Sequence, residues 1–211
     1  LQAIQCSLRD LMFSKVDYLT KIFKFCGSRL KKLPPKLEEF VDFCDFIERM
    51  KEMTLYINNE IDFIDEMCSL FEGCGFTAAG NIEHVRNPLH ASFQAFKKDQ
   101  NIALTIKDSL YDKFVSKLEE LILEKSIKLE KYHQSFKTFP GSLEEVDVDE
   151  MLRAAQAIKE TIEEMSPEIE ELIVSQKILK YENNEFNLFH VVSNDALYQE
   201  NLFSTIKKWN E

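Results

Sequence analysis

The chain has 211 residues, with 37 Asp and Glu against 26 Lys and Arg, which gives a formal net charge of −11 at pH 7. This acidity argues against nucleic acid as the main partner, because binding to phosphates needs clustered Lys and Arg. Only five Gly and five Pro occur, which argues against collagen, low-complexity disorder and a turn-rich all-β fold. No apolar run approaches the roughly 20 residues that span a bilayer, so we expect no membrane insertion.

The cysteines point to a reducing compartment. They are Cys6, Cys26, Cys44, Cys68 and Cys74. Because their number is odd and none forms a C-x-x-C pair, we expect no disulfide framework. Cys44 and Cys68 stand among apolar neighbours, so we expect them to be small buried side chains in a reducing cytoplasm. The chain begins with Leu1 and not with Met, and no signal-type apolar region follows it. We therefore expect a piece of a longer polypeptide.

Helical periodicity dominates the first third of the chain. A first helix is predicted from about Gln2 to Cys26, and a second from Lys36 to Glu72, between Pro34-Pro35 and Gly73. The second helix carries a seam of residues spaced by three or four, with one phase slip at Met50. Its members are Leu37, Phe40, Cys44, Ile47, Met50, Thr54, Ile57, Ile61, Ile64, Cys68 and Phe71. At 1.5 Å per residue this helix would be about 55 Å long.

The rest of the chain predicts three more long helices and one irregular stretch. Residues 73–100 are the least regular, with one short helix around Leu89 to Lys97. A long helix is predicted from about Ile102 to Thr138, ending at Pro140-Gly141. Helical periodicity returns from about Asp149 to Glu182, as two helices or as one helix kinked at Ser166-Pro167, because Ser followed by Pro is also a good helix start. A last helix begins near Asn194 and continues to the end.

These elements predict an all-α fold, an elongated stack of long antiparallel helices in bundles. The expected organisation is a first bundle unit over residues 1–76, an irregular connector with a short helix over 77–100, and a second bundle unit over 101–211.

No motif in the sequence indicates a catalytic, cofactor-binding or metal-binding site. Gly75 and Gly80 have the spacing of a nucleotide-binding Walker A loop, but Asn81 and Ile82 stand where Lys and Ser or Thr are required. Glu130 and His133 form an E-x-x-H as in di-iron bundles, but no second E-x-x-H accompanies them. We therefore expect a non-enzymatic segment without cofactor or metal. A helical enzyme with a carboxylate–His site around His133 is the alternative from a different class.

Charge is unevenly distributed. Residues 142–172 hold eleven acidic residues against Arg153 and Lys159, so this window carries −9 of the chain's −11. It is either a solvated helix face or a docking surface for a basic partner, whose binding would then weaken with salt. A smaller basic cluster, Arg29, Lys31 and Lys32, follows the first predicted helix.

Three stretches resemble the tail of dynein heavy chains, especially axonemal members, near the linker. LPPKLEEFVDFCDFIERMKEMTLYINNEIDFIDEMCSLFE is similar to the family's Pro-rich turn, L-E-E-L and long helix. KLEELILEKSIKLEKYHQSFKTFPGS is similar to its helix ending in a Phe-rich turn, with Pro140-Gly141 in reversed order. LFSTIKKWNE resembles L-W-x-L-Y-x-x-W, with Phe203 for the first Trp, Ile206 for the Tyr, and Trp209 at the last position.

The resemblance implies a structural role within a microtubule motor whose ATP sites lie elsewhere, in the ring. Such a segment carries force from motor to cargo and docks intermediate chains, light chains or neighbouring heavy chains, in the cytoskeleton of a cilium or flagellum axoneme. The remaining alternative is a stand-alone helical adaptor or tethering bundle that binds a basic partner through the acidic 142–172 face.

Overall fold

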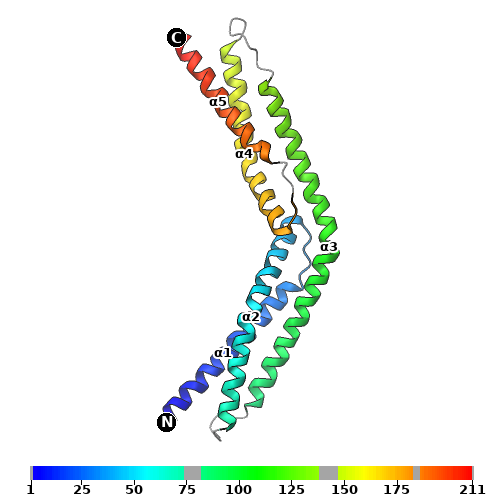
Figure 1. Cartoon of the computed structure of the whole chain (residues 1–211), viewed down its shortest axis with the longest axis vertical. Helices are drawn as coiled ribbons and strands as arrows, with labels where there is room; N and C mark the ends of the chain where they lie inside the picture. The colour runs from blue at the N-terminus through cyan, green and yellow to red at the C-terminus, as the bar shows by residue number, and fades with distance from the viewer. Residues whose placement is uncertain (1, 74–81, 138–146, 183–185, 211) are drawn as a thin grey trace. The chain divides into compact units, whose positions relative to one another are not determined.

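The computed structural model describes residues 2–73, 82–137, 147–182 and 186–210. The helices are α1 (Gln2–Leu30), α2 (Leu37–Gly73), α3 (Glu83–Lys137), α4 (Val148–Leu179) and α5 (Asn187–Asn210) (Figure 1). No strand occurs among the described residues. The predicted all-α helical-bundle fold is therefore confirmed, and α2 matches its predicted bounds to within one residue at each end.

The prediction of an irregular stretch over residues 73–100 is wrong for the described part of that stretch. From Glu83 onward the chain is helical, so the short helix expected over Leu89 to Lys97 is part of α3, which has 55 residues. Leu89, Phe93 and Phe96 are buried at steps of four and three, and this packing holds the segment helical despite Pro88.

Two polar contacts fix the same part of α3 to α2. Arg86 Nε donates a hydrogen bond to Asp65 Oδ1 at 2.9 Å, and His90 Nε2 lies 2.9 Å from the same oxygen. Because Asp65 belongs to α2, one carboxylate oxygen joins the first turns of α3 to the last turns of α2.

The last helix also begins earlier than expected, at Asn187 rather than near Asn194. Phe189, Val192 and Ala196 are buried at steps of three and four, so the apolar seam of α5 starts before Asn194. Residues of the kind that cap helix N-termini, Ser193 and Asn194, lie inside the helix instead.

The chain divides into two compact units, Leu1–Asp112 and Lys113–Glu211. The boundary falls inside α3, not at the positions 76 and 101 expected from the sequence, so α3 contributes to both units. Each unit has buried apolar residues of its own.

In the first unit, α2 runs antiparallel to α1 and to the first part of α3 (Figure 1). The Phe23 ring of α1 lies 5.5 Å from that of Phe93 and 5.2 Å from that of Phe96. On the α2 side, Cys68 Sγ lies 3.7 Å from Met12 Sδ. The three helices therefore share one apolar core, the expected result of packing apolar helix faces together.

In the second unit, α4 and α5 lie side by side and antiparallel (Figure 1). The second part of α3 supplies further buried residues, Phe114, Leu118, Ile122, Leu129 and Phe136. Lys125 of α3 pairs with Glu168 of α4. The unit thus buries apolar faces from all three of its helices.

Helix α4 is a single helix, which decides between the two alternatives left open by Ser166-Pro167. Pro167 lies in its interior. The helix begins after Asp147, whose Oδ1 accepts hydrogen bonds from the backbone N–H groups of Asp149 at 3.0 Å and Glu150 at 3.2 Å. Asp147 is therefore an N-cap. The carboxylates of Asp149 and Glu150 also stabilise the helix, because they lie near the positive end of its dipole.

Helix α4 ends at Leu179 and is followed by the capping residue Lys180, whose left-handed backbone (φ 54°) predicts a stabilising substitution. A side chain with a Cβ is strained in that region and Gly is not. We therefore expect Lys180→Gly to raise the free energy of unfolding by about 0.5–1 kcal/mol, measured by urea denaturation. Lys177→Gly, in the last helical turn, is the control and should lower it by about 1 kcal/mol. Equal losses of unfolding free energy in the two variants would contradict backbone strain at Lys180.

Candidate functional site

The segment with the Walker A spacing, from Gly75 to Ile82, lies outside the described residues, apart from Ile82. That side chain is buried with the apolar core of the first unit. Ile82 therefore has a packing role.

The E-x-x-H residue His133 lies on α3 in the second unit, largely buried. Its Nδ1 lies 3.3 Å from Asp195 Oδ2 of α5, but the pair does not have hydrogen-bond geometry. Among the described residues, no group of three or more His, Cys, Asp or Glu side chains is placed to hold a metal ion. The geometry around His133 therefore amounts to one carboxylate beside one imidazole.

Three of the cysteines are buried, namely Cys26, Cys44 and Cys68, whereas Cys6 is exposed; Cys74 lies outside the described residues. Burial raises the pKa of all three buried thiols, that of Cys44 to about 11. A raised pKa keeps these thiols protonated and poorly nucleophilic at neutral pH. The described buried cysteines therefore act as small apolar side chains, as predicted.

The acidic stretch is described from Asp147 onward and follows α4. All eight acidic side chains of the helix are exposed, namely Asp149, Glu150, Glu160, Glu163, Glu164, Glu168, Glu170 and Glu171. Some are neutralised locally: Asp149 Oδ1 lies 2.7 Å from Lys207 Nζ, and Glu168 pairs with Lys125. Glu164 and Glu171 have no ion-pair partner in the described part of the chain.

The uncompensated residues form a row on α4. Glu164 and Glu171 are seven positions apart, with Glu160 one turn before them, so all three lie on one helix face. The buried residues Ile162 and Ile169 lie on the opposite side. The acidic face is thus the solvent side of α4.

One acidic residue of α5 is held tightly against α4. Lys159 Nζ lies 2.8 Å from Glu200 Oε2, and Gln156 Nε2 donates a hydrogen bond to Glu200 Oε1 at 3.4 Å. The hydrogen bond from Lys159 lowers the pKa of Glu200 below its ordinary value of 4.5 and raises the pKa of Lys159 above 10.5. The contact joins residues 41 positions apart.

This pair predicts a pH-dependent contribution to stability. A lowered carboxyl pKa in the folded state stabilises the fold above the unfolded value, about 4.5, and the effect is lost as pH falls through the folded pKa. We expect Glu200→Gln to destabilise the chain at pH 7 and to cost much less at pH 3, measured by urea denaturation at both. Glu164→Gln, which removes an exposed carboxylate of α4 that has no ion-pair partner among the described residues, is the control. A Glu200→Gln loss independent of pH would contradict the assignment.

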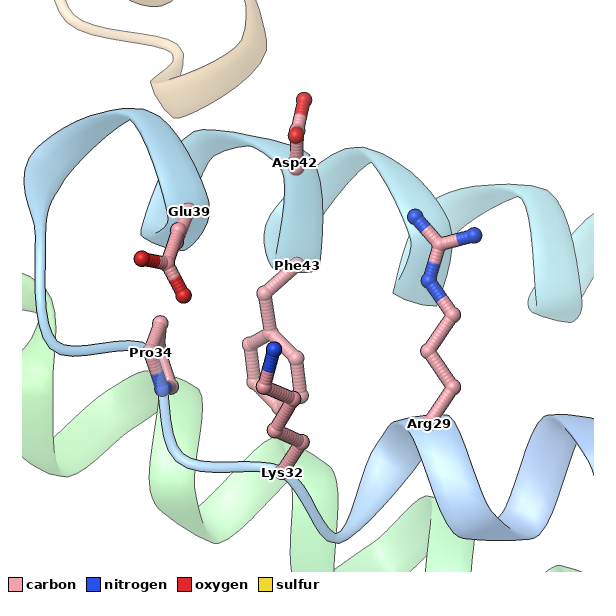
Figure 2. Close-up of a pocket in the computed structure, with 6 residues that line it drawn as sticks. All are labelled: Arg29, Lys32, Pro34, Glu39, Asp42 and Phe43. Atoms are coloured by element: carbon pink, nitrogen blue, oxygen red, sulfur yellow. The ribbon is translucent and has the colours of Figure 1, made fainter.

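Two residues of the basic cluster, Arg29 and Lys32, line an open pocket of about 130 Å³ at the turn between α1 and α2. Figure 2 shows Phe43 pointing from α2 toward this turn, Glu39 pointing toward Pro34, and Asp42 pointing away from it. Arg29 lies over the Phe46 ring at 4.3 Å, a cation–π contact. Because acidic and basic side chains both line this pocket, its charges offset one another.

A larger open pocket, about 380 Å³, lies between α1 and α3 in the first unit. Buried Asp99 at its edge pairs with Lys31 at 2.9 Å between Oδ2 and Nζ. A Cβ on Gly27 would lie only 2.7 Å from the same oxygen. Glycine at this position therefore gives the carboxylate room between the two helices, and the pocket is a feature of helix packing.

One surface was missed by the sequence analysis. Helix α1 exposes a row of large apolar side chains seven residues apart, Ile4, Leu11, Tyr18 and Phe25. The seven-residue spacing is visible in the sequence. The sequence does not show that a different apolar row of the same helix, which includes Met12, Leu19 and Phe23, is the one that is buried.

No family model, curated protein or solved structure matches the chain. None of the helices in the described ranges combines the length and apolarity needed to cross a membrane.

Proposed function

We propose that this chain is a non-catalytic structural segment of a dynein-like microtubule motor heavy chain, which transmits force and docks associated chains. The observation that carries the proposal is the continuity of α3. Its 55 residues run through the boundary at Asp112 and contribute buried side chains to both compact units.

Long laterally packed helices suit this task physically. Along a helix axis, load is carried by a ladder of backbone hydrogen bonds. Side-by-side packing shares that load between neighbouring helices through their apolar seams. Ion pairs between helices, such as Lys159 with Glu200 and Lys107 with Glu48 at 3.3 Å, oppose sliding.

The resemblance to dynein tails supports the proposal independently of the helix lengths. Its first stretch coincides with α2 and the turn before it, and its second with the end of α3 as far as Lys137. From the third stretch, Phe203 is buried and Trp209 is 88% exposed. In such a heavy chain, the partners would be intermediate chains, light chains and neighbouring heavy chains, in a cilium or flagellum axoneme.

The intact mass of the natural polypeptide tests the proposal. An antibody against the 211-residue chain would isolate it from cell or cilium extract for mass measurement. We expect several hundred kilodaltons, together with co-sedimentation on microtubules that ATP releases. A natural polypeptide of about 25 kDa would contradict the motor assignment.

A second candidate function is an adaptor that binds a basic partner through the acidic face of α4. The observation that favours it is the exposed row of Glu160, Glu164 and Glu171, in which Glu164 and Glu171 have no ion-pair partner in the described part of the chain. Replacing all three with Gln should weaken binding to a cationic partner, and added salt should weaken wild-type binding in the same way. Binding that ignores both changes would contradict this function.

A further inference from the structure

The open pocket between α1 and α3 has the size of a small-molecule site. Its volume, about 380 Å³, falls within the range of cavities that hold organic ligands. Helix packing leaves this space because small residues line it from both helices, namely Gly27, Ser28, Ser92 and Ala95. Phe23 and Phe96, whose ring centroids lie 5.2 Å apart, add apolar surface to the lining. The pocket can therefore hold an apolar group.

The buried carboxylate of this pocket adds no net charge, because it belongs to an ion pair. Asp99 is 9% exposed, and Lys31 Nζ lies 2.9 Å from its Oδ2. A side chain on Gly27 would crowd the same oxygen, so glycine allows the carboxylate to reach Lys31. Asp99 therefore holds the Lys31 ammonium at the pocket, and the two charges offset each other.

Lys24 gives the pocket lining one uncompensated positive charge. It lines the pocket from α1 and has no ion-pair partner among the described residues. Apart from Asp99, no Asp or Glu occurs in residues 18–32 or 84–100, the helix segments that contain the lining residues. These segments therefore offer no second carboxylate to Lys24. The lining carries a net charge of opposite sign to the −11 of the whole chain.

Ser92 offers a hydrogen-bond donor from the α3 side of the pocket. Ser28 Oγ donates to the carbonyl O of Phe25 at 2.7 Å, a local bond that is common for Ser in helices. In contrast, Ser92 Oγ has no hydrogen-bond partner in the part of the chain that the structure describes. Its hydroxyl and the Lys24 ammonium are two donors of the kind that bind a carboxylate.

We infer that this pocket binds a small organic anion, a monocarboxylate with a short apolar chain. The carboxylate accepts hydrogen bonds from Lys24 and Ser92, and the apolar chain packs against Phe23, Phe96 and Ala95. One carboxylate is favoured because the lining carries one net positive charge. The site goes beyond the proposed structural function, which does not depend on it.

Octanoate and octylamine test the inference on the full 211-residue chain, because their apolar chains are similar and their charges are opposite at pH 7. Binding is measured by isothermal titration calorimetry at about 0.1 M salt, where screening is moderate. We expect octanoate to bind at least about fivefold more tightly than octylamine. Equal or tighter binding of octylamine would contradict the charge argument, and no binding of octanoate would overturn the inference.

A matched pair of lysine variants tests the anion-binding group. Lys24→Gln should weaken octanoate binding about fivefold, because it removes the uncompensated charge of the lining. Lys208→Gln is the control: it makes the same change at an exposed residue of α5 that also has no ion-pair partner among the described residues. This control should leave binding within about twofold. Equal losses in the two variants would place the bound octanoate outside the pocket.

A second pair of variants tests the pocket itself. Ala95→Leu fills the space between the helices and should weaken octanoate binding at least about tenfold. Ala154→Leu adds the same group to an exposed position of α4, outside the pocket, and should leave binding within about twofold. Leu is a good helix former, so both variants should keep the fold, as circular dichroism will check. Unchanged binding in Ala95→Leu would overturn the inference, whereas the mass of the natural polypeptide tests the motor assignment separately.

Discussion

Replacing Phe40 with Ala should lower the free energy of unfolding by about 3–5 kcal/mol, the range found for large-to-small changes at buried aromatic residues. Phe40 is fully buried (0% exposed) in the first turns of α2. The loss has two parts: the apolar surface that no longer leaves water on folding, and the cavity that rigid helix neighbours cannot fill. Urea denaturation followed by circular dichroism measures the change.

Phe25→Ala is the matched control, because the same atoms are removed from a side chain that is 66% exposed. This variant leaves no buried cavity, so we expect a loss of less than about 1 kcal/mol. Similar losses at the two positions would mean that Phe40 is not packed as described, and the bundle assignment for α2 would fail.

The bounds of α2 could be predicted because local signals agree with the tertiary packing. Pro34-Pro35 precedes the helix, Gly73 ends it, and its three-and-four spacing corresponds to side chains that are buried. The start of α3 does not follow from local signals, because Pro88 disfavours a helix interior. The contacts of Leu89, Phe93 and Phe96 with the rest of the first unit outweigh that local preference.

The candidate surfaces were predictable to different degrees. The solvent-facing position of the acidic residues on α4 follows from composition, because isolated carboxylates are rarely buried. The pairing of Lys159 with Glu200 does not follow from composition. It joins residues 41 positions apart and depends on how α4 and α5 align along each other. The exposed row of α1 (Ile4, Leu11, Tyr18 and Phe25) has a visible spacing, but α1 has two apolar rows. Only the packing of Phe23 against Phe93 and Phe96 shows which row faces inward.

The second large effect is expected to be stabilising. Pro167 lies in the interior of α4, where it cannot donate the backbone hydrogen bond to the carbonyl of Glu163, and where its ring crowds that carbonyl. Ala restores the donor and removes the crowding. Because Pro167 is exposed, no core packing is lost. The gain is reduced by up to about 1 kcal/mol, since the unfolded chain becomes more flexible without the ring. We therefore expect Pro167→Ala to raise the free energy of unfolding by about 1–3 kcal/mol.

Pro35→Ala separates the helix effect from the effect on the unfolded chain. Pro35 is exposed in the turn before α2 and lies outside any helix, so its replacement restores no helical hydrogen bond. Only the greater flexibility of the unfolded chain remains, and the variant should lose about 0.4–1 kcal/mol. The two proline substitutions should therefore shift urea denaturation midpoints in opposite directions. If Pro167→Ala also destabilises, α4 does not continue through residue 167 as a single helix, and the second unit would have to be described with two shorter helices in its place.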